Sequence, residues 1–481
     1  MTHELQNLAQ ALLLRGELLV LLYFLAVNGW YLVLLVSSYL EMRRHLILIA
    51  DESRWRLLSS ELSPGISMLA PAYNEEATIE TSVRALLALH YPRLEVVVVN
   101  DGSKDRTIQV LRDQFDLVVV KAVYDRNIET KPVRAVYRSA TYPGLVVVDK
   151  ENGGKADALN VGLNFAQGKL VCAMDADTLI EPDGLQRMVR PFLHANDVVA
   201  TGGTIRIVNG SEIRSGRVVR ARVPTNLLAG LQVVEYLRAF LFGRLGWNRL
   251  GGNLIISGAF GLFRREAVLA AGGYLHDTVG EDMELVLRLK RRGYETGGPG
   301  RIAFVPDPVA WTEAPESIRV LSRQRDRWHR GLSDVLWRHR KMFLNLRYGV
   351  TGLVVFPYYV FVELLAPVIE AVGILGLLLG LAFGLVDWPF AFLFFLTAYG
   401  LGTALTAFTL ILEDLSFHTY ATFRDRTKLF GWVLIENLGY RQMTVFWRLR
   451  GLWKFIRGRK DWGDMTRKGF SQKSAVAPRL R

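Results

Sequence analysis

Residues 169–180 read KLVCAMDADTLI, a short apolar run that ends abruptly in acidic residues. A run of this kind, bounded by polar turn residues, predicts a buried strand. Because side chains alternate along a strand, Asp175 and Asp177 would lie on the same side, separated only by Ala176. Two adjacent carboxylates repel each other unless a cation or a proton sits between them. The stretch therefore predicts either a Mg²⁺ or Mn²⁺ site shared with phosphate oxygens, or a solvated acidic turn.

Alternating strands and helices surround this stretch. The expected elements are strands at residues 66–70, 94–99, 117–123 and 145–148 and a helix at residues 155–166. This alternation predicts an α/β domain with a mostly parallel sheet and helices on both faces. Ligands of such sheets bind beyond the carboxyl ends of the strands. We therefore expect the polar strand endings to converge on one crevice, namely residues 100–102, 149–150 and 175–177.

Apolar segments on both sides of this domain predict a membrane protein. Residues 18–40 contain no charged residue and are long enough, at about 23 residues, to span a bilayer. Four arginines follow this segment within 16 residues and only Arg15 precedes it, so the positive-inside rule places the N-terminus outside and the following domain in the cytoplasm. Residues 350–386 and 388–412 predict at least two further spans. The first of these is too long for one straight helix, and it contains Pro357, Pro367 and Gly373.

The C-terminal part is strongly basic. Residues 441–481 contain 12 Lys and Arg against two Asp, within a chain of net charge +13. This charge follows apolar segments and accompanies no nucleic-acid-binding motif, so we expect it to face anionic lipids and not nucleic acid. Residues 429–456 mix polar and apolar residues, which favours an interfacial or re-entrant segment over a plain span.

These patterns divide the chain into five regions of a multi-pass plasma (inner) membrane protein. The regions are an N-terminal transmembrane helix and linker (residues 1–62), a cytoplasmic catalytic domain (63–312), an amphipathic interfacial helix region (313–347), C-terminal transmembrane helices (348–420), and an interfacial or re-entrant segment with a basic cytoplasmic tail (421–481).

Several motifs carry side chains that could act on a phosphorylated substrate. Asp101 ends a strand and could accept hydrogen bonds from a base or ribose, although Asn-Asp-Gly-Ser is also a common turn. The glycines before Lys155 expose backbone amides at a helix start, where Lys155 could hold a diphosphate or simply be solvated. Glu281 and Asp282 open another helix, either as dipole partners or with a carboxylate that could deprotonate a hydroxyl group.

An amphipathic basic helix is predicted after Pro315, and it carries Gln324, Arg327 and Trp328. Arg327 could neutralise a diphosphate and Trp328 could stack on a sugar face. The alternative is that both side chains only pack at the membrane surface. Glu363 and Glu370 lie two helical turns apart in an apolar segment. They would either line a path for a polysaccharide or pair with arginines at the interface.

In this order, the motifs resemble a known family signature. Asp101, residues 175–177 (DAD), residues 280–282 (GED) and residues 324–328 (QRDRW) are similar to the D, DxD, (T/G)ED and QxxRW motifs of membrane-embedded family 2 glycosyltransferases. That family includes cellulose, chitin, hyaluronan and poly-N-acetylglucosamine synthases. The segments NGGKADALN (152–160) and SGAFGLF (257–263) resemble the poly-N-acetylglucosamine-synthase-like branch most. Two positions depart from the pattern, because Asn100 replaces a frequent aspartate and Gly280 replaces a threonine.

The resemblance implies a GT-A fold and a role for each motif residue. Asp101 would hold the uracil, Lys155 the diphosphate, and Asp175 the ribose or donor sugar. Asp177, together with Asp175, would bind Mg²⁺ or Mn²⁺. Asp282 would be the general base, with Glu281 beside it in the catalytic set. The acceptor and diphosphate site would be shaped by Gln324, Arg327 and Trp328.

The activity expected from this resemblance is that of a metal-dependent inverting glycosyltransferase. It would use a UDP-sugar, with UDP-GlcNAc or UDP-glucose favoured, to build and translocate a β-linked polysaccharide. Its partners would be the UDP-sugar donor, the growing glycan, membrane lipids and accessory export subunits. The alternative enzyme function is a single glycosyl transfer to a lipid acceptor. A catalytically silent membrane scaffold is a third reading, against which the complete carboxylate set argues.

Overall fold

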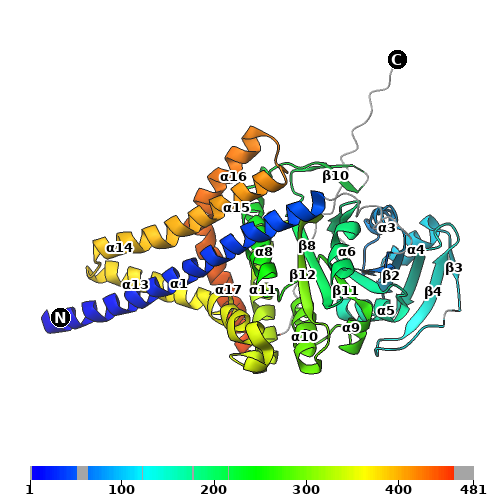
Figure 1. Cartoon of the computed structure of the whole chain (residues 1–481), viewed down its shortest axis with the longest axis horizontal. Coiled ribbons are helices and arrows are strands. Elements are labelled where there is room, and N and C mark those ends of the chain that lie inside the picture. Colours follow the sequence, from blue (N-terminus) through cyan, green and yellow to red (C-terminus); the bar gives the residue numbers. More distant parts are fainter. Residues whose placement is uncertain (1–2, 51–62, 122, 176–177, 215, 460–481) are drawn as a thin grey trace, which may run out of the picture.

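A ten-stranded sheet organises the part of the chain that follows the first helix (Figure 1). The computed structural model describes residues 3–50, 63–121, 123–175, 178–214 and 216–459. Within these residues the strand order is β3-β4-β5-β2-β1-β6-β11-β8-β12-β7, and β9 and β10 form a separate ribbon. The strands are β1 (Ile66–Ala72), β2 (Leu94–Asp101), β3 (Leu117–Val119), β4 (Val133–Ser139), β5 (Leu145–Lys150), β6 (Leu170–Met174), β7 (Thr178–Ile180), β8 (Val198–Ile207), β9 (Glu212–Arg214), β10 (Arg217–Arg220), β11 (Phe260–Arg264) and β12 (Arg301–Thr312).

The centre of the sheet is parallel and its flanks contain antiparallel pairs. Strands β5, β2, β1 and β6 pair in parallel, as expected. Strand β4 is antiparallel to β5 because the short connection between them can only form a hairpin. Strand β11 begins where β6 ends, since Phe260 pairs with Met174, and it therefore runs in the opposite direction. The sheet as a whole is thus mixed, and the expected parallel character holds for its central block.

Helices cover both faces of the sheet, as the sequence predicts. Alternate strand residues enter two different cores: Val96 and Val98 belong to one, and Val97 and Val99 to the other. Helices α3 (Ile79–Leu87), α4 (Thr107–Gln114), α6 (Gly184–His194) and α7 (Leu227–Leu237) contribute to the first core. Helices α5 (Lys155–Phe165), α9 (Arg265–Ala270) and α10 (Glu281–Thr296) contribute to the second.

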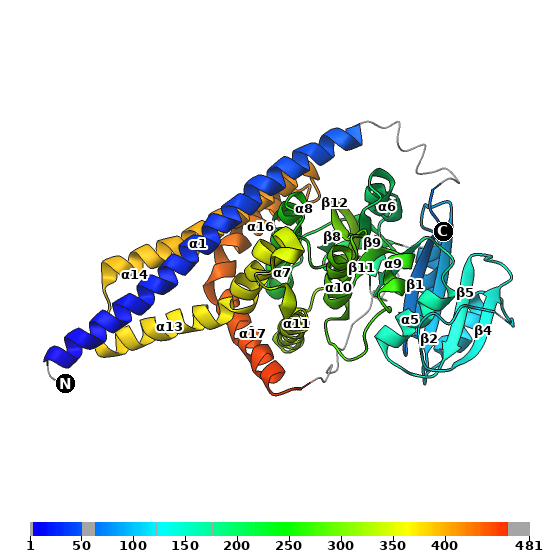
Figure 2. The ribbon, with the colours of Figure 1, turned by 60° about the horizontal axis from the view of Figure 1, so that its bottom comes forward.

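Apolar helices extend together from one end of the molecule, away from the sheet (Figures 1 and 2). Three stretches are long and apolar enough to cross a membrane, within α1 (His3–Ala50) and in the later part of the chain. The two later stretches are Ala366–Phe383 and Trp388–Ser416, and a shorter apolar helix covers Thr351–Leu364. The expected interruption of residues 350–386 falls at Leu365, just before Pro367, which cannot donate a backbone hydrogen bond.

The helices not yet given bounds either link the sheet to these apolar segments or form the segments themselves. Residues 429–456, expected to be interfacial or re-entrant, form parts of two helices separated by non-helical backbone at Leu438 and Gly439. The helices are η2 (Arg238–Arg244), α8 (Leu245–Arg249), α11 (Ile318–Arg338), η3 (Arg340–Met342), η4 (Leu346–Tyr348), η5 (Thr351–Val355), α12 (Phe356–Tyr358), η6 (Tyr359–Leu364), α13 (Ala366–Phe383), α14 (Trp388–Phe395), η7 (Leu396–Leu401), α15 (Gly402–Ser416), α16 (Phe423–Ile435), η8 (Glu436–Tyr440) and α17 (Arg441–Ile456).

Candidate active site

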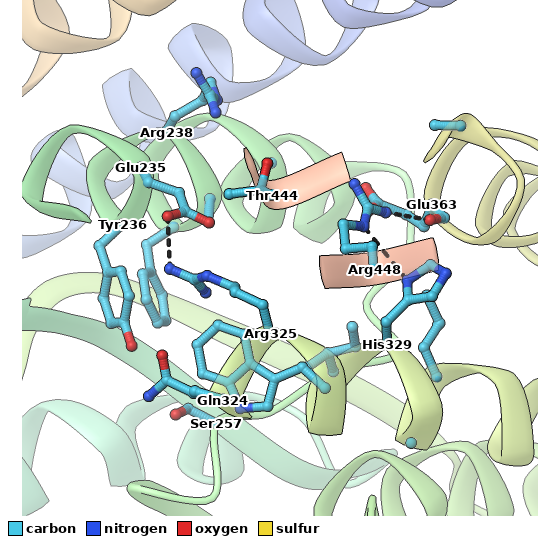
Figure 3. A pocket seen from close by; sticks show the side chains of 18 of the residues that line it. Glu235, Tyr236, Arg238, Ser257, Gln324, Arg325, His329, Glu363, Thr444 and Arg448 are labelled. Carbon is cyan, nitrogen blue, oxygen red and sulfur yellow. Dashed lines mark hydrogen bonds and ion pairs between the residues drawn. The ribbon is translucent and has the colours of Figure 1, made fainter. Parts of the chain in front are cut away.

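One cavity of about 970 Å³ joins the end of β6 to the apolar helices. At one end its wall contains Lys155 and Asp175, and at the other it contains Glu370 and Arg441. Figure 3 shows Gln324 and Arg325 on one side of this cavity and Glu363 and Arg448 on another. The cavity therefore connects residues of the sheet domain to residues of the membrane-associated helices.

A lysine and two carboxylates meet where β6 ends and α10 begins. The Lys155 ammonium lies 2.6 Å from Asp175 and 3.5 Å from Glu281. Lys155 is the first residue of α5 and follows Gly154, whose φ of 86° favours glycine. Burial raises the pKa of Glu281; Lys155 opposes this shift and Asp282 adds to it. Burial alone would lower the pKa of Lys155, but Asp175 and Glu281 outweigh it and raise that pKa.

The Asp282 carboxylate is held by backbone amides at the cavity wall. One of its oxygens accepts a hydrogen bond from the Gly258 amide at 3.0 Å, and the other accepts one from the Met283 amide at 2.8 Å. Gly258 belongs to the SGAFGLF segment. That segment therefore fixes the position of Asp282, a role that its sequence did not indicate.

Asp101 is buried at the end of β2 and does not belong to the cavity wall described above. Its carboxylate accepts hydrogen bonds from the Lys150 ammonium at 2.5 Å and from the Gly153 and Gly154 amides at 2.9 and 2.8 Å. These bonds brace the loop that leads to Lys155. The contact with uracil stays a prediction, as does the metal role of Asp177, because residues 176–177 lie outside the described part of the chain.

The departure at Asn100 has a local reason. Its side-chain amide donates a hydrogen bond to Asp149 at 2.6 Å, and the two residues are direct partners in the β2–β5 pair. An aspartate at position 100 would face the Asp149 carboxylate and repel it. The amide therefore stabilises this strand pair.

The QRDRW motif lies on α11, and all of its residues except Asp326 line the cavity. Gln324, Arg327 and Trp328 lie on the cavity wall, at the positions that share one helical face. The Trp328 side chain is half-exposed. The Gln324 carbonyl oxygen is buried without a hydrogen-bond partner among the described residues. The structure thus brings these three residues to the same cavity as Lys155, Asp175, Glu281 and Asp282.

The two central residues of the motif anchor α11 to other helices. Arg325 pairs with Glu235 of α7 at 2.6 Å, and its guanidinium lies 4.5 Å from the ring centre of Trp328. Asp326 is buried and accepts hydrogen bonds from Arg450 and Lys454 of α17 at 2.8 and 2.6 Å. These contacts hold the motif between α7 and α17.

Ion pairs line the cavity near the apolar helices. Glu370 binds Arg441 through two hydrogen bonds of 2.8 and 3.0 Å, and Glu363 lies 3.8 Å from Arg448. Both glutamates pair with arginines, which confirms the second alternative raised by the sequence, and both line the cavity, while a polysaccharide path stays a prediction. Glu235 and Arg238 are among the charged lining residues that sequence reasoning missed. Their position within a mainly apolar run, residues 227–242, was the available signal.

Comparisons with known proteins assign the chain to a family. The model described as "Glycosyl transferase family group 2" matches residues 170–410, half of the chain, and "Glycosyl transferase family 2" matches residues 67–270. The chain is a family 2 glycosyltransferase. Its fold is the GT-A fold with additional apolar helices, and these helices make it membrane-associated.

Two relatives and one solved structure illustrate the likeness. The poly-β-1,6-N-acetyl-D-glucosamine synthase of Staphylococcus aureus (strain COL) is 31% identical over 275 residues, which cover 57% of this chain and 56% of that protein. The probable glycosyltransferase YdaM of Bacillus subtilis is 27% identical over 331 residues, covering 68% of this chain and 69% of YdaM. The mannosyltransferase PcManGT from Pyrobaculum calidifontis, solved with GDP-Man and Mn²⁺, is 19% identical at a TM-score of 0.49, covering 88% of this chain and 99% of that one.

Proposed function

We propose that the chain transfers a sugar from a UDP-sugar, with UDP-GlcNAc or UDP-glucose favoured, to a growing β-linked glycan, with inversion, and passes the product across the plasma membrane. The observation that carries this proposal is the single cavity that runs from Asp282 to Glu370. The 31% identity to a poly-β-1,6-N-acetyl-D-glucosamine synthase supports the choice of product class. The five regions expected from the sequence, with the catalytic domain in the cytoplasm, form part of the proposal.

The donor would bind at the Lys155 end of the cavity. Lys155 and Arg327 bring positive charge to the cavity wall, where they would bind the diphosphate. Lys155 would then exchange its contact with Asp175 for a contact with phosphate oxygens. Asp101 would support this site by holding the loop before Lys155 through the Gly153 and Gly154 amides, in addition to its predicted contact with uracil.

The residues at this end fit a divalent metal ion. Asp175 offers a hard oxygen ligand, and Glu281 and Asp282 add carboxylates to the same wall. No group of three metal-ligating side chains occurs among the described residues. Mg²⁺ is usually held by one or two carboxylates together with substrate phosphates, so two protein ligands would suffice here. Asp175 and Asp177 would hold Mg²⁺ or Mn²⁺, which when bound would neutralise charge on the departing diphosphate.

Asp282 would act as the general base. It would remove the proton from the acceptor hydroxyl as that oxygen bonds to the anomeric carbon and the bond from this carbon to the diphosphate oxygen breaks. Attack from the face opposite the leaving group converts an α-linked donor to a β-glycoside. The amides of Gly258 and Met283 keep the Asp282 carboxylate in place, and general-base catalysis of this kind contributes about 10²–10⁴-fold to the rate.

The product would leave through the ion-paired part of the cavity. Glu370 and Arg441 compensate each other's charge and still present oxygen and nitrogen atoms to the lumen. Paired charges of this kind can exchange hydrogen bonds with sugar hydroxyls without leaving an uncompensated charge near the membrane. Trp328, at the catalytic end, would stack on the terminal sugar of the acceptor.

The experiment that tests the proposal measures the size of the product. Membranes containing the chain are incubated with labelled UDP-GlcNAc or UDP-glucose and Mg²⁺ or Mn²⁺, and the product is sized before and after glycosidase treatment. We expect a long, glycosidase-sensitive polymer from the wild type. Asp282→Asn should bind the UDP-sugar and lose transfer by at least about 100-fold. A single sugar on an extractable lipid would contradict polymer synthesis and indicate lipid glycosylation. No transfer from any donor would contradict both enzyme functions.

A further inference from the structure

Two glycines bring the general-base loop and the QRDRW helix into backbone contact. Gly280 directly precedes Glu281 and Asp282, and Gly331 lies on α11 three residues after Trp328. A Cβ atom on Gly331 would lie 3.2 Å from the Gly280 Cα, and a Cβ on Gly280 would lie 3.2 Å from the Gly331 Cα. Both distances are tighter than ordinary van der Waals contact. Because the opposing atoms belong to backbone, no side-chain rotation could relieve them.

A second contact joins the same two helices farther along. The buried Glu284, one turn into α10, lies 3.3 Å from the His339 ring at the end of α11. Between these points, apolar side chains of both helices belong to one core, with Met283 and Leu287 from α10 and Val335 and Leu336 from α11. Two contacts eight residues apart on α11 fix both the separation and the angle of the helices. We call the region between these two contacts, from Gly280 and Gly331 to Glu284 and His339, the joint of the two helices. The glycine pair forms its end at the start of α10.

We infer that Gly331 is a positioning residue for the transfer reaction: its contact with Gly280 sets the distance between the Asp282 base and the Gln324–Trp328 face of α11. This inference rests on the proposed function, in which Asp282 takes the acceptor proton and α11 holds the acceptor. Lys155 and Asp175, which would hold the donor, lie on elements outside the joint, and Arg327 of α11 would add one contact to the diphosphate. A wider joint would therefore separate the base from the acceptor and would change donor binding less than it changes the rate of transfer.

The same contact explains why a glycine suits position 280. The resemblance places a threonine there in many family members. In this chain a β-branched side chain at position 280 would have to push α11 away, because Gly331 already touches the backbone at this point. A displacement of about 1 Å in an active site can cost about 100-fold in rate. Glycine at position 280 therefore permits the backbone contact between the base loop and α11 in this chain.

The test places methyl groups in this joint and at a matched position elsewhere. Gly331→Ala is compared with Gly431→Ala, which lies in the helix α16 where an added Cβ meets no atom within 4 Å. Alanine is otherwise favourable in a helix interior, so helix propensity alone would stabilise both variants. The full-length enzyme is assayed in membranes or detergent for kcat, for the KM of the UDP-sugar, for UDP affinity and stoichiometry, and for thermal stability. UDP stoichiometry gives the folded fraction to which kcat is normalised.

We expect Gly331→Ala to lower kcat by about 3- to 10-fold, because the added Cβ requires α11 to move by a few tenths of an ångström, with donor KM and UDP affinity changed less than kcat because Lys155 stays in place. Gly431→Ala should match the wild type. In the double variant Gly280→Ala/Gly331→Ala, the second substitution should cost less than the first, because the joint is already widened. Should Gly331→Ala fold poorly, Gly280→Ala introduces the same close contact from the loop side and is held to the same expectation.

Two results would overturn the inference. One is a Gly331→Ala enzyme, or in its place a Gly280→Ala enzyme, with wild-type kcat per bound UDP. The other is a fall in kcat matched by an equal fall in UDP affinity, which would indicate general damage to the site. Failure of the proposed function is separate, because in that case the wild type itself would transfer no sugar.

Discussion

Replacement of Lys155 by methionine tests whether its ammonium group neutralises the carboxylates of the donor site. The Lys155 ammonium lies between Asp175 and Glu281, at 2.6 and 3.5 Å. Its removal leaves these two carboxylates and Asp282 near one another without their cation. We therefore expect Lys155→Met to lower the stability of the protein without divalent ions and to strengthen the binding of Mg²⁺ in the absence of donor.

The magnitude follows from distance and exposure. Two unit charges about 4 Å apart interact by about 4 kcal/mol at an effective dielectric constant of about 20. The Lys155 and Asp175 side chains are each 27% exposed, so solvent screening reduces this figure to about 2 kcal/mol. That energy corresponds to roughly 30-fold tighter Mg²⁺ binding in the variant. Donor affinity should move in the opposite direction, because the diphosphate loses the ammonium group.

The assay is thermal unfolding of the purified full-length protein in detergent, titrated with MgCl₂ without donor. Ligand stabilisation grows with the logarithm of concentration over dissociation constant, so the Mg²⁺ midpoint reports affinity directly. Lys155→Arg keeps the charge, and Lys169→Met removes an exposed lysine that is not on the cavity wall. Both should behave like the wild type. Equal Mg²⁺ midpoints for Lys155→Met and the wild type would refute the assignment of Lys155 as the cation that occupies this carboxylate site.

Two further predictions concern stability and ion pairing. Because the pKa of Glu281 is raised in the folded protein, its stabilising contribution is complete below the ordinary pKa of 4.5 and is lost as the pH rises through the raised pKa. Glu281→Gln cannot ionise, so its melting temperature should rise relative to that of the wild type between pH 5 and pH 8. A difference in melting temperature that stays constant across this pH range would contradict the prediction. Arg441→Gln leaves the largely buried Glu370 without its cation. Each single variant of this pair should therefore lose more thermal stability and polymer yield than the double variant Glu370→Gln/Arg441→Gln. Additive losses would show that the two residues are not coupled.

The sequence predicts the fold where local patterns are strong. The apolar run before Asp175 forms β6, and the helix expected at residues 155–166 is α5. The antiparallel strand β11 escaped prediction because its direction depends on where β6 ends, which no local pattern records. The burial of Asp101 was equally hidden, since its partners Lys150 and Gly153 lie about fifty residues away in the chain. The sequence supplies residue types in order, and the pairing of distant residues decides which of them face the cavity.

The spacing of the QRDRW motif has a geometric meaning on α11. Gln324, Arg327 and Trp328 lie at relative positions 0, 3 and 4, which share one helical face, and all three line the cavity. Of the two intervening residues, Arg325 also lines the cavity and pairs there with Glu235 of α7, whereas Asp326 is not on the cavity wall and pairs with Arg450 and Lys454 of α17. In this chain the two positions between Gln324 and Arg327 therefore carry buried ion pairs that hold α11 in place. Gly331 of the same helix touches Gly280, so the orientation of α11 bears on the distance between this cavity face and Asp282.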